Sequence, residues 1–89
     1  MRMRTTRVTT IEQLSDLVSR GNVCVLFDDK AQVPRIVDAG FDSLYVMVTP
    51  DNAHEFQVSH IPQLRVYHDG VEKLSHTGDD YNAVLNNLR

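Results

Sequence analysis

A single cysteine, four histidines and the adjacent carboxylates Asp28 and Asp29 are the residues of this 89-residue chain that we consider for catalysis or metal binding. Cys24 lies inside the apolar run from Val23 to Phe27, where a thiol usually serves as a small core residue. With one cysteine, the chain can form no intramolecular disulfide. The four histidines are His54, His60, His68 and His76. They do not show the paired spacing of metal ligands, so we expect no metal site and no cofactor.

The adjacent carboxylates Asp28 and Asp29 follow the apolar run directly. Two carboxylates at the end of a strand could bind a cation. The same pair is also typical of a solvated loop, and that is the interpretation we favour.

Charge and composition exclude several classes of function. The net charge is −3 and the acidic residues are scattered, whereas a nucleic-acid binder usually shows a basic stripe. Arg2, Arg4 and Arg7 are interpreted as a solvated tail rather than a phosphate clamp. No apolar run approaches the ~20 residues that span a bilayer, and the basic N-terminus lacks the apolar core of a secretion signal. We expect one small cytoplasmic domain, residues 1–89, with neither nucleic acid nor membrane as partner.

An amphipathic helix is predicted near the N-terminus, after a short strand around Val8. Thr10 is a good N-cap, and Gln13 lies at the capping-box position three residues later. Gly21 is expected to end this helix in a left-handed conformation. The apolar stripe of the helix consists of Ile11, Leu14, Leu17 and Val18.

The rest of the chain alternates strand and helix patterns. The run 23–27 is apolar on both sides, as in a central strand covered on both faces. Asp69-Gly70 is a strong two-residue hairpin signal. The remaining predicted elements are a short helix from Pro34 to Gly40, a strand over 44–48, a helix from Asp51 or Asn52 through Phe56, strands over 63–68 and 71–77, and a helix capped by Asp79 or Asp80 with Tyr81, Val84, Leu85 and Leu88 on one face.

The stretch around Ile61-Pro62 carries a resemblance to a known family. A helix, the pattern V-x-x-I-P-x-L-x-V-Y-x-D-G, a strand, T-G and a last helix are similar to the C-terminal half of thioredoxin. The resemblance extends from Val8 to Leu88. It implies an α/β thioredoxin-like fold: a central mixed β-sheet in the order β-α-β-α-β-α-β-β-α, flanked by helices. It also implies that Pro62 follows a cis peptide bond, and that the residue before it pairs with the backbone of a bound peptide.

The dithiol of that family is missing from this chain. The four residues that match its C-G-P-C motif are Gln32-Val33-Pro34-Arg35, so the proline is kept and both cysteines are lost. Disulfide exchange needs an attacking thiolate and a resolving thiol, which glutamine and arginine cannot supply. The family also carries a buried acid one residue before the Phe that ends the central strand, and Leu26 stands there. We therefore expect a redox-inactive protein and no enzymatic activity.

The second helix is shorter than in the family, because it ends at Gly40. That helix normally covers one face of the sheet. We expect its loss to uncover apolar atoms around Tyr45 and Met47, and an exposed apolar patch commonly marks a contact site.

The resemblance favours a protein-binding module or adaptor that contacts a partner with the cis-proline end of the fold. Such a domain could be an accessory subunit or a phage-encoded factor directed at a host protein. Two alternatives stay open: a monothiol redox protein that uses Cys24, and a homodimeric structural or assembly protein. The expected partner surface consists of Gln32, Val33, Pro34, Arg35, Ser59, His60, Ile61, Pro62, Gln63, Thr77, Gly78 and Asp79.

Overall fold

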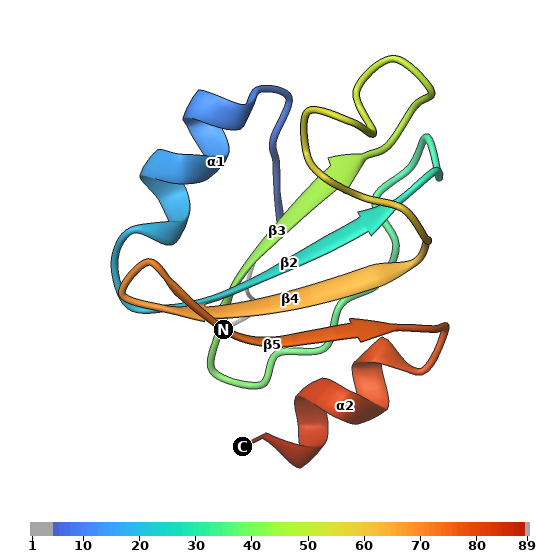
Figure 1. The fold of residues 1–89 in the computed structure, drawn as a ribbon. Coiled ribbons are helices and arrows are strands. Elements are labelled where there is room, and N and C mark those ends of the chain that lie inside the picture. The colour runs from blue at the N-terminus through green and yellow to red at the C-terminus, as the bar shows by residue number, and fades with distance from the viewer. Residues whose placement is uncertain (1–4, 89) are drawn as a thin grey trace.

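The computed structural model describes residues 5–88, which form a five-stranded sheet with one helix on each face (Figure 1). The order along the chain is β-α-β-β-β-β-α. The elements are β1 (Thr5–Arg7), α1 (Ile11–Val18), β2 (Asn22–Asp28), β3 (Asp42–Met47), β4 (Gln63–His68), β5 (Val71–Thr77) and α2 (Tyr81–Asn87). Within the described residues, no helix is long and apolar enough to cross a membrane.

The sheet is mixed, as expected, with the strand order β1-β3-β2-β4-β5. β3 pairs in parallel with both β1 and β2, while β4 pairs antiparallel with β2 and β5. β2 is therefore the central strand, and its residues from Val23 to Asp28 are all buried. The turn between β4 and β5 has positive φ at Asp69 (49°) and Gly70 (86°), which confirms the predicted hairpin.

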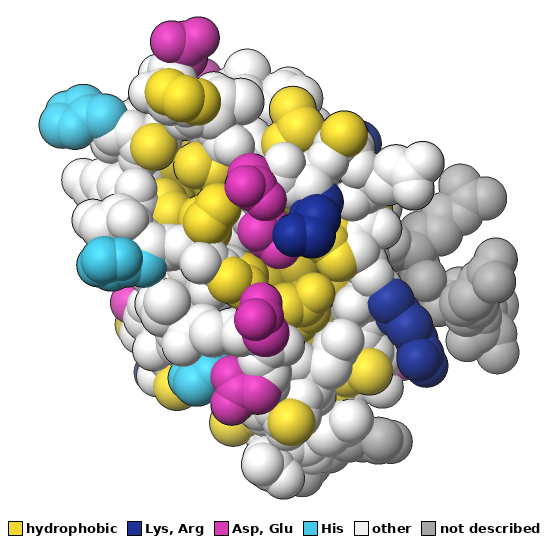
Figure 2. Space-filling view, turned by 90° about the vertical axis from the view of Figure 1, so that its right-hand side faces the viewer, with side chains coloured by type: hydrophobic (Ala, Val, Ile, Leu, Met, Phe, Trp, Pro, Cys, Tyr) yellow, Lys and Arg dark blue, Asp and Glu magenta, His cyan; other side chains and the backbone are white. Residues whose placement is uncertain are grey.

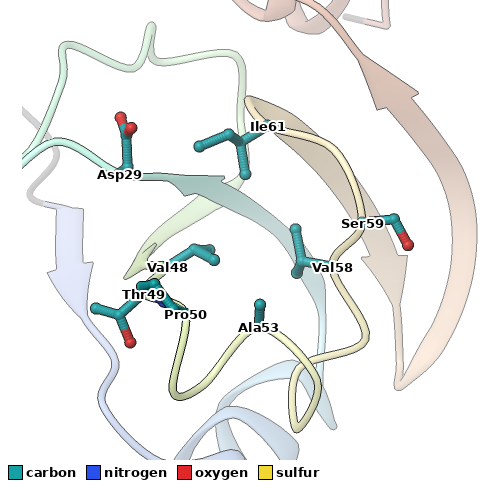
Figure 3. A pocket seen from close by; sticks show the side chains of 8 residues that line it. All are labelled: Asp29, Val48, Thr49, Pro50, Ala53, Val58, Ser59 and Ile61. Carbon is teal, nitrogen blue, oxygen red and sulfur yellow. The ribbon is translucent and has the colours of Figure 1, made fainter.

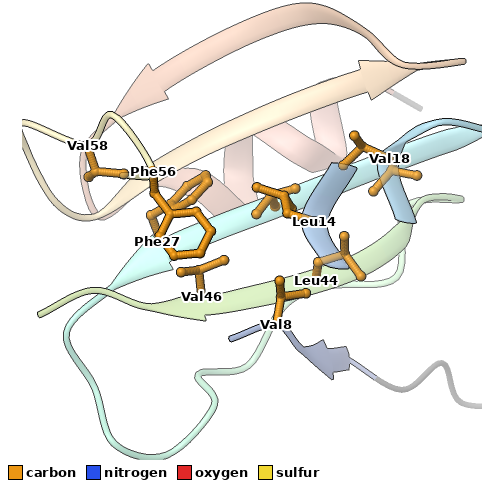
Figure 4. Close-up of a cluster of buried hydrophobic side chains, with 10 residues drawn as sticks. Val8, Leu14, Val18, Phe27, Leu44, Val46, Phe56 and Val58 are labelled. Atoms are coloured by element: carbon orange, nitrogen blue, oxygen red, sulfur yellow. The ribbon is translucent and has the colours of Figure 1, made fainter. Parts of the chain in front are cut away.

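One face of the sheet packs against α1 and the segment that precedes β4 (Figure 4). The rings of Phe27 and Phe56 meet at a tilted angle, with centroids 6.1 Å apart. Thr10 caps α1 as predicted, since its Oγ1 accepts the Gln13 amide at 3.1 Å. The buried residues of this cluster are Val8, Leu14, Val18, Val23, Val25, Phe27, Leu44, Val46, Phe56 and Val58.

The opposite face packs against α2 and the connection between β2 and β3. Leu85 of α2 is fully buried there, whereas Leu88, which we expected on the same face, is 44% exposed and follows the end of the helix. The buried residues of this second cluster are Cys24, Ala39, Leu64, Val66 and Leu85, with Ile36, Val37, Phe41, Leu74, Tyr81 and Val84 packed against them.

The predicted helix from Pro34 to Gly40 does not form, and the prediction was wrong. Its backbone groups bond to side chains instead: the Val37 amide donates to Asn82 Oδ1 at 2.9 Å, and the Gly40 amide donates to Asp38 Oδ1 at 3.2 Å. Seven residues give fewer than two helical turns, which is too short to offset the cost of nucleation without strong packing. The apolar residues of the segment still cover the sheet.

The predicted helix from Asp51 or Asn52 through Phe56 is also absent, and a series of turns occupies residues 50–57. Asn52 ties the start of this turn segment to the strand before it, since its Nδ2 donates to the Met47 carbonyl and its Oδ1 accepts the Thr49 amide. The backbone bonds that follow span three, four or five residues, and Gln57 has a positive φ of 58°. Mixed spacing and a left-handed residue end helical propagation.

Tyr45 is fully buried, so the expected apolar patch around it does not exist. Its hydroxyl donates to the Lys30 carbonyl at 2.6 Å, and the Arg7 guanidinium lies 5.8 Å from its ring centroid. Arg7 also donates to the Ala31 carbonyl at 2.8 Å. An irregular segment and one arginine thus cover the position for which the resemblance implied a helix. Met47 is half-buried. Arg2 and Arg4, the other residues of the basic tail, lie outside the described residues.

Candidate functional site at the carboxyl ends of the central strands

Two of the three predicted partner segments lie side by side. The Gly78 amide donates to the Pro62 carbonyl at 3.0 Å, and Thr77 pairs with Gln63 across β5 and β4. The peptide bond between Ile61 and Pro62 is cis. The segments Ser59–Gln63 and Thr77–Asp79 therefore form one continuous surface beside the ends of β2 and β3 (Figure 1).

The third segment, Gln32–Arg35, is held by α2. Asn82 Nδ2 donates to the Arg35 carbonyl at 3.0 Å, while Asn82 Oδ1 accepts the Val37 amide. Asn82 lies in the first turn of α2, which follows the loop that contains Gly78. The side chains of Gln32 and Arg35 are exposed, and those of Val33 and Pro34 are half-buried. A single amide side chain thus takes the place of helical hydrogen bonds in fixing this segment.

A hollow of about 270 Å³ lies next to the cis-proline loop (Figure 3). Ile61 points into it from the cis-proline loop, and 38% of its surface is exposed (Figure 3). Asp29 lies at the rim, on the segment that follows β2 (Figure 3). The other lining residues are Val48, Thr49, Pro50, Ala53, Val58 and Ser59.

Asp28 is buried, with 5% of its surface exposed, so the expectation of a solvated pair was wrong for this residue. It lies two and four residues after Leu26 and Cys24 along β2, so it shares their face, which is the α2 side of the sheet. Its Oδ1 accepts the Asp29 amide at 2.8 Å. Asp29 itself is exposed, as expected.

The cation that approaches both carboxylates is Lys30. Its Nζ lies 3.9 Å from Asp28 Oδ2 and 3.7 Å from Asp29 Oδ1, and the lysine side chain is 64% exposed. Both distances exceed that of a charge-assisted hydrogen bond, so the ammonium is held loosely. Among the described residues, no group of three or more histidine, cysteine or acidic side chains could hold a metal ion.

Two tyrosines lie near the buried carboxylate. Burial, and then the negative charge of Asp28, raise the pKa of Tyr45. The same two causes, in the same order, raise the pKa of Tyr81 at the start of α2. Both phenols therefore stay neutral at physiological pH, and neither supplies an ionised nucleophile.

Cys24 is fully buried on the α2 side of β2. Its Sγ lies 3.6 Å from Ser43 Oγ. Burial raises the pKa of the thiol, and the hydrogen bond to Ser43 opposes this only in part. Reactivity belongs to the thiolate, so this environment suits a core residue.

The histidines occupy separate places. His54 and His60 are exposed in the turn segment and the cis-proline loop. His68 contacts Asn22 and Asp69 at the opposite end of the sheet. His76 Nε2 lies 2.7 Å from Asp80 Oδ1, which links the end of β5 to the start of α2.

Four features of the site were not predicted from the sequence: the burial of Asp28, the hollow, and two polar residues that organise the loops, Arg65 and Asn82. Arg65 stacks on Phe27 at 4.4 Å from the ring centroid and donates to the carbonyls of Phe56 and Gln57. Asp28 lies two residues after the apolar Leu26, so the alternation of side chains along the strand could have predicted that both face the same side of the sheet. The roles of Arg65 and Asn82 had no local signal, because their partners are 8 to 47 residues distant.

Comparison with family models finds no match, and comparison with curated proteins finds none either. Solved structures do match. Thioredoxin from Entamoeba histolytica, solved as a cysteine-to-serine mutant, superposes with a TM-score of 0.71 at 19% identity, covering 97% of this chain and 100% of that one. Malassezia sympodialis thioredoxin superposes with a TM-score of 0.69 at 17% identity, covering 97% and 91% of the two chains.

A third match lies outside natural proteins. The crystal structure of a designed protein superposes with a TM-score of 0.72 at 12% identity, covering 94% of this chain and 93% of that one. Identities this low, together with near-complete coverage, establish architecture and topology but not activity. The chain has a thioredoxin-like fold.

Proposed function

We propose that this protein is a redox-inactive, thioredoxin-like binding module that contacts a protein partner with its loop end. The loop end is the surface formed by residues 29–35, 48–53, 58–63 and 77–79. The observation that carries the proposal is the composition of this surface: an apolar hollow with the exposed Ile61 beside segments that contain no thiol.

The chemistry of the loop end supports binding over disulfide exchange. Gln32 and Arg35 stand where the resemblance places the two cysteines, and neither side chain forms or resolves a mixed disulfide. Cys24 is buried within the sheet, so it offers no substitute thiol at this surface. Loops fixed on a rigid sheet are the usual carriers of binding, and here Gly78, Asn82 and Arg65 fix them.

The test is quantitative capture of partners from an extract of the organism that encodes the protein, followed by calorimetry with the purified partner. Arg35→Glu, His60→Ala and Gln63→Ala each alter the loop end. We expect the two alanine variants to weaken binding and Arg35→Glu to change the affinity through its reversed charge. Arg20→Glu is the matched control for Arg35→Glu, because Arg20 is an exposed arginine in the connection that enters β2 at the opposite end of the sheet.

The proposal fails if all three loop-end variants bind the captured partner like the wild type. It also fails if Arg20→Glu changes the affinity as much as Arg35→Glu, because the effect would then follow net charge rather than position.

A further inference from the structure

We propose that the loop end recognises a partner segment in which a large apolar side chain is flanked by arginine or lysine. This inference rests on the proposed function and specifies the chemistry of the partner. It joins two features of the same surface, the apolar hollow and the carboxylates around it.

The hollow provides the apolar half of the site. Its walls come from three separate segments: Asp29 after β2, residues 48–53 after β3, and residues 58–61 of the cis-proline loop (Figure 3). Val58 is buried at its base, and Ile61 leaves more than a third of its surface exposed beside it. A volume of about 270 Å³ is enough for one leucine-sized or larger side chain. Burying such a side chain removes apolar area from water on both partners.

The side chains around the hollow provide the charged half of the proposed site. The ends of the strands and the loops that follow them bring several carboxylates to this end of the sheet, against fewer cations. Figure 2 shows acidic side chains set around and between the hydrophobic side chains that gather on this face. The acidic residues are Asp28, Asp29, Asp51, Asp79 and Asp80, and the basic ones are Lys30, Arg35 and Arg7, which donates to the Ala31 carbonyl.

This balance argues against a second copy of the chain as the occupant. Two loop ends placed face to face would oppose acidic rims, and like charges in a partly desolvated interface are unfavourable. A basic segment meets no such repulsion.

The position of the Lys30 ammonium indicates where a cation of the partner would bind. This ammonium lies between Asp28 and Asp29 but outside hydrogen-bond distance of both. Asp28 Oδ1 already accepts the Asp29 amide, whereas Oδ2 is the oxygen that the Lys30 ammonium approaches. A guanidinium from the partner, with its planar set of donors, suits two neighbouring carboxylates better than the flexible ammonium that it would displace.

The two halves are adjacent, because Asp29 belongs to both. It lines the hollow beside Ile61 and lies 3.7 Å from the Lys30 ammonium. An extended segment can therefore place an apolar side chain in the hollow while a neighbouring residue reaches the carboxylates.

The experiment uses four synthetic heptapeptides with blocked ends, titrated into the ¹⁵N-labelled protein at low salt. Three share a central leucine and differ in its two flanking residues, which are arginine, serine or glutamate. The fourth has arginine flanks around glycine. We expect affinity to fall in the order arginine, serine, glutamate, and the glycine peptide to bind about tenfold more weakly than its leucine counterpart. The shifted amides should lie in residues 29–30, 48–53 and 58–61.

Substitutions of the protein sharpen the test. Lys30→Gln removes the competing ammonium, so it should tighten the arginine peptide by about two- to fivefold, whereas Asp29→Asn should weaken it by a similar factor. Lys73→Gln and Asp42→Asn are the matched controls, because Lys73 is exposed on β5 and Asp42 lies at the opposite end of β3. Neither control should change affinity.

Any of three results overturns this inference: glutamate flanks bind as well as arginine flanks, Lys30→Gln fails to tighten the arginine peptide, or the shifts fall on another face. Absence of binding by all four peptides at millimolar concentration also overturns it. The proposed function is judged separately, by whether the loop-end variants alter binding of the captured partner. A partner that contacts Arg35 and Gln63 through an acidic segment would therefore contradict only the inference that the partner segment is basic.

Discussion

The amide of Gly78 donates to the carbonyl of Pro62 at 3.0 Å, and this bond joins the loop before α2 to the cis-proline loop. Gly78 has a φ of 142°, a conformation that residues with a side chain rarely adopt. A Cβ at this position would lie 2.9 Å from Asp80 Oδ1. The contact between the two loops therefore depends on a residue without a side chain.

Gly78→Ala is expected to destabilise the protein by about 1–3 kcal/mol, because the alanine would either strain the backbone or displace the side chain of Asp80. Urea denaturation followed by circular dichroism measures the free energy of unfolding. Gly40→Ala is the comparison variant, because Gly40 also has a positive φ, 86°, but nothing lies within 4 Å of a Cβ there. Equal losses in the two variants would show that the contact with Asp80 adds nothing to the backbone cost.

Arg65 links β4 to the turn segment, and we expect Arg65→Met to destabilise the protein by about 1–3 kcal/mol. Methionine keeps an apolar stem against Phe27 but loses the donors that reach the Phe56 and Gln57 carbonyls at 3.1 and 2.7 Å. Hydrogen exchange should become faster at the amides of residues 56–58, whereas the amides of β2 should change only with global stability.

Arg65→Lys separates charge from geometry in the same measurement. A single ammonium cannot reproduce the two parallel donations, so we expect lysine to restore only part of the loss. Full restoration by lysine would mean that the positive charge alone orders the turn segment.

The strands could be predicted from the sequence, because their signals are local. Period-two patterns, the Asp69-Gly70 turn and the apolar run before Asp28 each identify one element without knowledge of its neighbours. The two predicted helices that are absent depend on distant groups. Asn82 satisfies the backbone of the 34–40 segment, and Arg65 holds the end of the turn segment. Short helical patterns give way when such partners offer an alternative.

The candidate site shows the same limit. The cis-proline loop could be located from one motif, but the hollow beside it needs residues from three separate segments. Tyr45 was expected to be exposed because the helix above it is short, yet the chain covers it with the backbone of Lys30 and the side chain of Arg7. Coverage of a sheet face depends on tertiary packing, and helix length alone does not determine it.

Asp80 should titrate below its ordinary pKa of 3.8, chiefly because of its side-chain hydrogen bond to His76. A carboxyl group whose pKa is lower in the folded protein stabilises the fold at pH values above its unfolded pKa. That contribution is lost as the pH falls below 3.8 towards the folded value. NMR titration of the Asp80 carboxyl carbon measures the shift directly. His76→Gln should move the midpoint back towards 3.8, and an unchanged midpoint would assign the shift to another cause.

Cys24 should react with a thiol reagent only when the protein opens, because its side chain is fully buried and burial raises the pKa of its thiol. At about pH 8, labelling of the folded protein by an aromatic disulfide should be at least about 100-fold slower than labelling in urea. The same preparation should reduce insulin no faster than the dithiothreitol background, and Cys24→Ser should leave that rate unchanged. Rapid labelling of the folded protein, with insulin reduction that Cys24→Ser abolishes, would instead support a monothiol redox protein.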